Sequence, residues 1–228
     1  MAKKRKKGKL IILEGGEGSG KSTMIKFLKK TFSQKQDVVF TREPGGTEIG
    51  VKIRKILMDK SNKKTTGLTE LFLFCADRTQ HVSELIIPTL KSGKHVISDR
   101  FDRSTVAYQI VARGIEDFNV FNQLNSIAKQ GVQPDAIIYL DVTPRVGLER
   151  KSKSKEGKCT RFDNESLRFH QAVRRGFKKY GKGTFRGNYK RRNNGGYDYI
   201  FHTIKTTHKS EEEVKQEVFT LVKKILDN

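Results

Sequence analysis

Apolar residues along this chain form short, nearly continuous runs that alternate with longer stretches of helical spacing. The short runs cover residues 10–13, 38–40, 95–98, 136–142 and 199–201. Runs of this length, rich in β-branched residues, are typical of strands that are buried on both faces of a sheet. The stretches of helical spacing cover residues 23–33, 49–57, 69–90, 104–111, 118–129, 164–177 and 211–226.

Strands that alternate with helices predict the α/β class. We expect a parallel sheet of about five strands flanked by helices, within a single domain over residues 10–228. The long helix over 69–90 should either kink near Pro88 or have its last turn there, because proline lacks a backbone N–H. The basic residues 1–9 are expected to form a disordered, solvated tail. No run of 18 apolar residues occurs, so the sequence predicts no membrane-spanning helix.

A glycine-rich segment follows the first apolar run and leads into a helix. It comprises Gly15, Gly16, Glu17, Gly18, Ser19, Gly20, Lys21, Ser22 and Thr23. This order of strand, loop, Lys-Ser and helix is that of a phosphate-binding loop, or P-loop, and predicts an ATP site. The backbone N–H groups and the helix N-terminus would cradle phosphates. Lys21 would reach the β- and γ-phosphates, and the Ser22 hydroxyl would bind Mg²⁺.

Charged side chains follow two of the other predicted strands. Arg42 comes after the second run, and Asp99 and Arg100 come after the third. Ligands bind at the carboxyl ends of strands in open α/β sheets. We therefore expect Arg42 to bind a second phosphate, Asp99 to hold Mg²⁺ through water, and Arg100 to face the phosphates.

Residues suited to reading a nucleobase lie on two predicted helices. Phe74 and Arg78 are one helical turn apart, so a ring plane and a guanidinium would share one face. Together they could stack on a base and hydrogen-bond it, although an apolar-face Phe is commonly a core residue. Thr105, Tyr108 and Gln109 follow the Asp99 strand end and are available to the same ligand.

The formal net charge of the 228-residue chain is +22. The basic residues concentrate in the tail and between Arg150 and Arg192. Nucleic-acid binding is one explanation of this charge, and an enzyme of anionic substrates is the other. The chain has 2 cysteines, too few for a disulfide framework, which favours a reducing cytoplasm.

The hydrophilic segment over about 148–162 fits a lid that closes over ATP. A phosphate-binding loop, a second set of arginines and such a lid are what a nucleoside monophosphate kinase needs, because both of its reactants are anionic. The alternative is a nucleic-acid-stimulated P-loop ATPase, which the charge would favour.

At this point the sequence resembles the thymidylate kinase family. The resemblance rests on segments that run in the same order as the family's motifs, at residues 14–23, 41–47, 73–81, 99–101, 104–109, 113–114 and 134–135. The Arg42-Glu43-Pro44-Gly45-Gly46 segment and the Phe74-Cys75-Ala76-Asp77-Arg78 segment are much more specific than the P-loop alone.

The resemblance implies ATP-dependent phosphorylation of dTMP to dTDP with Mg²⁺, in a homodimer. It implies that Arg42 and Arg100 grip the dTMP phosphate, and that Phe74 stacks on thymine. Arg78, Thr105 and Gln109 would read the base, Tyr108 would crowd the 2′ position of the sugar, and Glu17 would lie near the sugar and metal.

Gly18 occupies a position where some family members have an arginine, so the resemblance is to the bacterial-type group with a basic lid. That lid would supply the catalytic cation from Arg150, Lys153, Lys155, Lys158 or Arg161, with Arg150 and Arg161 the favoured residues. The chain departs from the family pattern at Phe101, where Tyr is usual, and at Thr160, where Asp is common. Beyond weak contact through the tail, nucleic acid is not expected as a partner.

Overall fold

The fold is built around one sheet in which every strand is parallel to its neighbours. The computed structural model describes residues 7–32, 37–115, 117–154, 160–181 and 199–227. The strands are β1 (Leu10–Gly15), β2 (Val38–Arg42), β3 (His95–Asp99), β4 (Ala136–Asp141) and β5 (Ile200–Lys205). The five-stranded sheet has the order β2-β3-β1-β4-β5, so the prediction of a parallel α/β sheet is confirmed.

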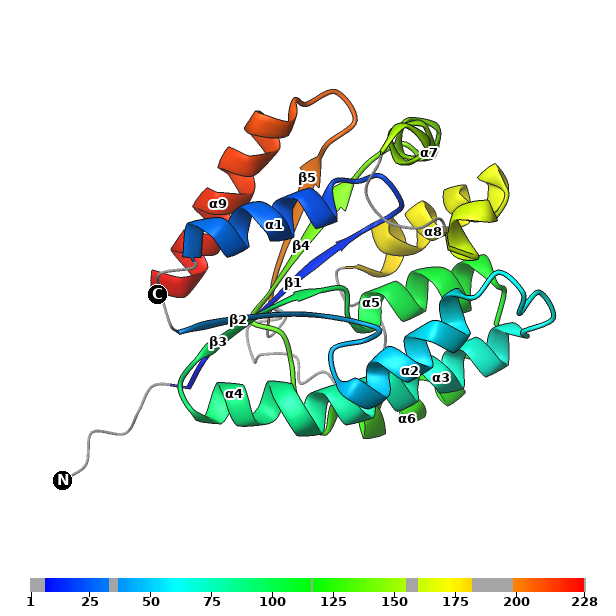
Figure 1. The fold of residues 1–228 in the computed structure, drawn as a ribbon, viewed down its shortest axis with the longest axis horizontal. Helices are drawn as coiled ribbons and strands as arrows, with labels where there is room; N and C mark the ends of the chain where they lie inside the picture. The colour runs from blue at the N-terminus through cyan, green and yellow to red at the C-terminus, as the bar shows by residue number, and fades with distance from the viewer. Residues whose placement is uncertain (1–6, 33–36, 116, 155–159, 182–198, 228) are drawn as a thin grey trace.

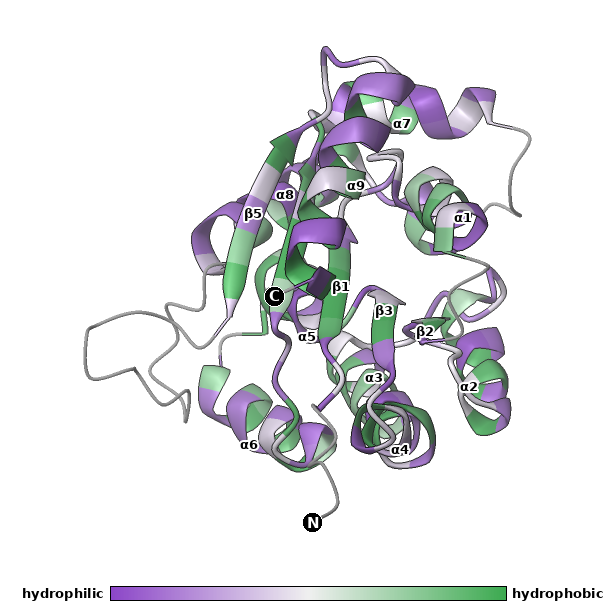
Figure 2. Cartoon of the chain, turned by 90° about the vertical axis from the view of Figure 1, so that its left-hand side faces the viewer, coloured by the Kyte–Doolittle hydropathy of each residue, from purple (hydrophilic) through white to green (hydrophobic). Residues whose placement is uncertain are grey.

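Strand β1 lies at the centre of the sheet, and its successive side chains point to opposite faces. All six of its residues are buried, because helices cover both faces. Ile11 and Leu13 pack with the helices of one face, whereas Leu10 and Ile12 pack on the other. The first face is covered by α1 (Lys21–Phe32) and α9 (Glu211–Asp227). Figure 2 shows the hydrophobic colour concentrated on the central strands and the hydrophilic colour on the outer helix surfaces.

The second face carries most of the other helices (Figure 1). These are α2 (Glu48–Met58), α3 (Gly67–His81), α4 (Ile87–Lys91), α5 (Asp102–Thr105), α6 (Phe118–Lys129) and α8 (Leu167–Tyr180). Helix α7 (Pro144–Lys153) follows β4 and leads toward a short 3₁₀ turn, η3 (Phe162–Asn164). Because the strands are parallel, all their carboxyl ends meet at one edge of the sheet.

The helix predicted over 69–90 is interrupted by a π-helical turn, η1 (Val82–Ile86). The N–H of Ile87 bonds the carbonyl oxygen of Val82, five residues earlier. Pro88 follows this turn and has no N–H to continue an α-helical ladder. The irregularity therefore precedes the proline. A second π-helical turn, η2 (Val106–Ala112), continues α5 over the segment predicted as the 104–111 helix.

Two predicted segments are only partly described. Residues 1–6 of the basic tail lie outside the described residues, but Gly8 donates its N–H to the carbonyl oxygen of Leu90. Lys9 donates its backbone N–H to His95 and its Nζ to the carbonyl oxygen of Ile225, so it belongs to the fold. In the predicted lid, residues up to Lys153 are helical, and 155–159 lie outside the described residues. Within the part of the chain that is described, no helix is long and apolar enough to cross a membrane.

Candidate active site

A cleft of about 480 Å³ opens at the carboxyl edge of the sheet. It is lined by the P-loop, the β2 and β3 ends, α3, η2, α7 and the start of α9. Many of the predicted site residues line it: Glu17, Gly18, Ser19, Gly20, Lys21, Ser22, Thr23, Phe74, Arg78, Asp99, Arg100, Thr105, Tyr108, Gln109 and Arg150. Of the other predicted site residues, Gly15, Gly16, Arg42 and Arg161 are not part of its lining.

The P-loop connects β1 to α1, as predicted. Lys21 is 7% exposed and donates from Nζ to the carbonyl oxygens of Gly15 and Gly16, at 2.8 and 3.0 Å. Burial, with the nearby Arg100 charge, lowers the pKa of Lys21 to about 8. The ammonium is thus held within the loop, where the phosphates of a nucleotide would bind.

Glu17 joins the P-loop to the other wall of the cleft. Its Oε1 accepts from the Tyr108 hydroxyl at 2.8 Å and from Arg100 at 3.2 Å. Burial alone would raise the pKa of Glu17, but Arg100 and Lys21 outweigh it and lower the pKa to about 2. Glu17 is therefore a carboxylate that fixes both Arg100 and Tyr108.

Arg100 has a strained backbone at the end of β3, with φ of 74° in the left-handed region. Its guanidinium donates to the carbonyl oxygen of Gly15 at 2.9 Å and lies 5.1 Å from the Tyr108 ring centroid. The strain places the side chain across the mouth of the P-loop, which is typical of a functional position.

The residues that were predicted to read a base line the same cleft. Phe74 is half-buried, and its ring lies 6.2 Å from that of Phe162. Gln109 donates to Glu70 at 2.9 Å, and Thr105 accepts from Arg78 at 2.9 Å. Phe74 packs against an apolar cluster and also lines the cleft, so its role as a ligand-binding residue stays a prediction.

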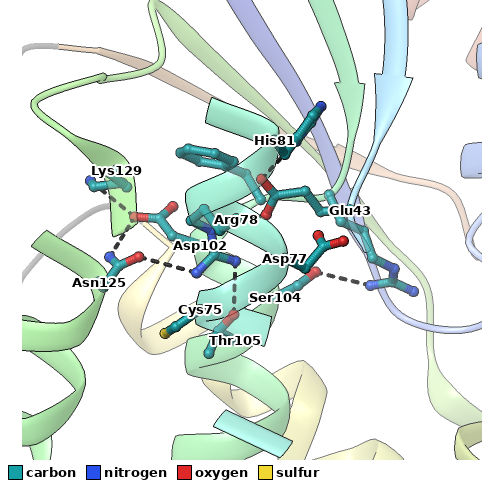
Figure 3. Close-up of polar contacts among 12 residues, drawn as sticks. Glu43, Cys75, Asp77, Arg78, His81, Asp102, Ser104, Thr105, Asn125 and Lys129 are labelled. Atoms are coloured by element: carbon teal, nitrogen blue, oxygen red, sulfur yellow. Dashed lines mark hydrogen bonds and ion pairs between the residues drawn. The ribbon is translucent and has the colours of Figure 1, made fainter. Parts of the chain in front are cut away.

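Arg78 is 1% exposed and sits in a dense polar network (Figure 3). It donates to Glu43 at 2.9 Å and to Asn125 at 3.1 Å, besides its bond to Thr105. Asn125 in turn donates to Asp102, which also accepts from Lys129 at 3.2 Å. Because the guanidinium is held from three sides, its orientation toward the cleft is fixed before any ligand arrives.

Arg54 on α2 is a cleft residue that the sequence reasoning missed. It donates to the carbonyl oxygen of Pro44 at 3.0 Å, and burial with the charges of Arg42 and Arg100 lowers its pKa. Arg42, which was predicted to bind a second phosphate, is exposed at the end of β2. A signal was present, because Arg54 lies on the predicted helix that directly follows the Pro-Gly-Gly turn.

The two favoured lid cations lie in different places. Arg150 lines the cleft and donates to the carbonyl oxygens of Thr206 and Thr207, at 3.0 and 3.1 Å. Arg161 instead pairs with the buried Glu70 at 2.7 Å and donates to the carbonyl oxygen of Leu57. In this arrangement Arg161 holds the 160–164 segment against α3 rather than facing the cleft.

A divalent cation would find few protein ligands here. Within the described ranges, no group of three His, Cys, Asp or Glu side chains could hold a metal ion. Asp99 and Ser22 both line the cleft, and the buried Oδ1 of Asp99 has no hydrogen-bond partner among the residues described. One carboxylate and one hydroxyl fit Mg²⁺, which takes its remaining ligands from water and phosphates.

The parallel sheet, the P-loop and the facing cationic pocket define the class of P-loop nucleoside monophosphate kinases. A solved thymidylate kinase from Ehrlichia chaffeensis has this fold, with a TM-score of 0.70 over 95% of this chain and 99% of that one, at 30% identity.

The family model for thymidylate kinase matches residues 13–218. Curated thymidylate kinases from Clostridium novyi and Caldicellulosiruptor saccharolyticus are 45% and 44% identical, covering 76% and 77% of this chain and 84% of each relative. The chain therefore belongs to the thymidylate kinase family, enzymes that phosphorylate dTMP with ATP as the donor. The family expectation from the sequence is confirmed.

Proposed function

We propose that this cleft transfers the γ-phosphoryl group of ATP to dTMP, giving dTDP and ADP. The observation that supports the proposal is the set of cations that line one cleft: Lys21 in the P-loop, Arg100 beside it on the same Gly15 carbonyl oxygen, and Arg54 on α2. Phosphoryl transfer between two anionic reactants needs this neutralisation and alignment, and little covalent chemistry from the protein.

ATP would bind along the P-loop, whose N–H groups and Lys21 hold the phosphates. Arg150 is fixed to the segment after β5 and would neutralise charge that develops on the transferred group. We propose that 148–162 acts as a lid, and that Arg161 contributes only if closure releases it from Glu70. Ser22, and Asp99 through water, would hold Mg²⁺, which would supply positive charge to neutralise the phosphates.

The dTMP phosphate would lie between Arg54 and Arg100, with Arg42 as an outer cation. Phe74 would stack on thymine while Arg78, Thr105 and Gln109 hydrogen-bond its edge. Tyr108 is anchored by Glu17, so its ring would occupy the space of a 2′-hydroxyl and favour deoxyribose.

The proposal is tested by a product assay with ATP, Mg²⁺ and a panel of dTMP, dUMP, dCMP and dAMP. We expect the highest kcat/KM with dTMP, and a Lys21→Ala variant should lose turnover by a factor of about 10² or more. Equal rates across the panel would refute dTMP as the substrate. The nucleic-acid-stimulated ATPase has no support from the relatives. It predicts ATP hydrolysis that rises with added DNA, which the same assay would detect.

We also propose a cytoplasmic homodimer, with the basic tail making at most weak contact with nucleic acid. Cys75 is a free, buried thiol, which suits a reducing compartment. Exposed apolar side chains on α2, α3 and α6 supply a face for a second copy: Ile49, Val51, Ile56, Leu68, Phe72 and Ile127.

A further inference from the structure

Asp77 is a fully buried carboxylate that does not line the cleft. It lies on α3 directly before Arg78, on the side near Glu43 (Figure 3). Its Oδ1 accepts the backbone N–H of Gly45 at 2.8 Å. Its Oδ2 is buried and has no hydrogen-bond partner among the described residues.

The peptide group that Asp77 holds has a second partner. Gly45 contributes the N–H of this peptide, and Pro44 contributes its carbonyl. That carbonyl oxygen accepts from Arg54 NH1 at 3.0 Å. One rigid, planar peptide thus joins Asp77 on its inner side to Arg54 on its cleft side. Hydrogen bonds in such a chain polarise and strengthen one another.

The surroundings leave space for this carboxylate and for no added side chain. A Cβ on Gly50 would lie 2.5 Å from Asp77 Oδ1, and one on Gly45 would lie 2.9 Å from the Cδ of Arg54. Gly45 also has φ of +103°, which L side chains rarely adopt. Both glycines therefore keep Asp77, the peptide and Arg54 in contact.

Keeping a carboxylate here is unfavourable for stability. Burial, with the neighbouring Glu43 charge, raises the pKa of Asp77 to about 6. A buried acid with one unpaired oxygen costs folding free energy that an apolar residue of similar size would not. Its presence at the back of a substrate-binding turn points to a role in the site.

We propose that Asp77 is a positioning residue that orients Arg54 through the Pro44–Gly45 peptide. The proposal rests on the proposed function, in which Arg54 contacts the phosphate of the acceptor nucleotide. Asp77 acts before binding: it fixes the peptide plane, the plane fixes the Arg54 fork, and the fork meets the phosphate without reorganisation.

The test is a double-mutant cycle with four proteins: wild type, Asp77→Ala, Arg54→Ala and the double variant. The nucleoside monophosphate that wild type turns over best serves as the acceptor throughout. We expect Asp77→Ala to raise the acceptor KM about tenfold, the effect of one charge-assisted hydrogen bond, with the ATP KM unchanged and kcat within about threefold. In the Arg54→Ala background, the Asp77→Ala change should have no further effect.

Two more variants separate positioning from general destabilisation. Asp77→Asn keeps an oxygen for the Gly45 N–H and should restore the KM to within about threefold of wild type. Gly50→Ala should reproduce the Asp77→Ala defect by displacing the carboxylate, although alanine is the better helix former. Gly50→Ala thus tests the positioning of Arg54 through the Pro44–Gly45 peptide even if Asp77→Ala does not fold. Glu48→Gln, at an exposed position on the same helix, is the matched control.

An unchanged acceptor KM in both Asp77→Ala and Gly50→Ala would overturn the proposal. So would an equal rise in the ATP KM, or an Asp77→Ala effect that is as large without Arg54 as with it. Failure of the proposed function is distinguishable, because it would show in wild type as a preferred acceptor other than dTMP.

Discussion

Glu14, the next-to-last residue of β1, is the buried anchor of the segment that carries Arg100. Its carboxylate accepts the N–H groups of Phe101 and Ser104, at 3.0 and 3.1 Å, and the Ser104 hydroxyl at 2.6 Å. The Ser104 hydroxyl in turn accepts from Arg100 at 3.1 Å. These bonds satisfy donors at the start of α5 and hold the strained Arg100 backbone in place.

The protonation of Glu14 should make stability depend on pH. Burial raises the pKa of Glu14 from 4.5 to about 7. The folded state therefore binds this proton more tightly than the unfolded state. The resulting stabilisation is fully present below about pH 4.5 and is lost as pH rises through 7. Relative to Glu14→Gln, wild type should lose up to about 3 kcal/mol of unfolding free energy between pH 5 and 8, measured by urea denaturation.

Glu17→Gln is the matched comparison for this measurement. Because the pKa of Glu17 is lowered to about 2, its carboxylate stays charged across pH 5 to 8. The stability difference between wild type and Glu17→Gln should therefore be constant over this range. A Glu14→Gln difference that is equally constant would contradict the raised pKa.

The residues that sequence reasoning located are those whose role is set by local order along the chain. Lys21 and Ser22 follow from loop spacing, and Asp99 and Arg100 from their place after a buried run. Arg161 was harder because its position depends on a partner far away in the sequence. Glu70 and Arg161 are 91 residues apart in the sequence, and no local sequence pattern predicts their ion pair.

At the scale of elements, helix α7 packs against the P-loop through two glycines. A Cβ on Gly18, which has φ of +64°, would lie 1.9 Å from the carbonyl oxygen of Gly147. A Cβ on Gly147 would lie 2.3 Å from the carbonyl oxygen of Glu17. With α7 in this place, no side chain fits at position 18. The position of α7, which carries Arg150, therefore requires a glycine at position 18.

This contact predicts the effect of Gly147→Ala. The added methyl group meets backbone, which cannot yield, so α7 must move away from the P-loop. We expect the ATP KM to rise and kcat to fall, each about tenfold, because Arg150 loses its position at the phosphates. Steady-state kinetics with varied ATP measure this. Ser152→Ala, exposed on the same helix, should be near normal, and normal kinetics in Gly147→Ala would contradict the coupling.

The spacing of apolar residues predicted well those helices and strands in which apolar residues recur regularly. All five strands and most helices follow from it. Helix α7 was missed because its sequence, Pro-Arg-Val-Gly-Leu-Glu-Arg-Lys-Ser-Lys, carries few apolar residues, and contact with the P-loop rather than a broad apolar stripe places it. The π-helical turns were missed because their extra residue depends on tertiary packing.

At the scale of the whole molecule, α3 has an inner side and an outer side. Its inner side carries Phe74 and Arg78, which line the cleft, and Asp77, which accepts the Gly45 N–H. Its outer side exposes Leu68 and Phe72, which are 48% and 51% exposed. Helices α2 and α6 both contact α3, and both expose further apolar side chains. Asn125 on α6 holds Arg78 from within, while Ile127 on the same helix is 70% exposed.

This arrangement predicts that the α2–α3–α6 face joins two copies of the chain. Contiguous apolar surface on adjacent helices is typical of an obligate interface and costly to leave in water. A single Phe72→Glu change places a charge on α3, the helix that contacts both α2 and α6, where pairing would bury the charge without a partner. By size-exclusion chromatography with light scattering, wild type should elute at twice the chain mass and Phe72→Glu at the monomer mass. Ile200→Glu alters a residue that is similarly exposed, at 49%, on β5, and should leave the dimer intact. A monomeric wild type would contradict the dimer, and dissociation by Ile200→Glu alone would place the interface elsewhere.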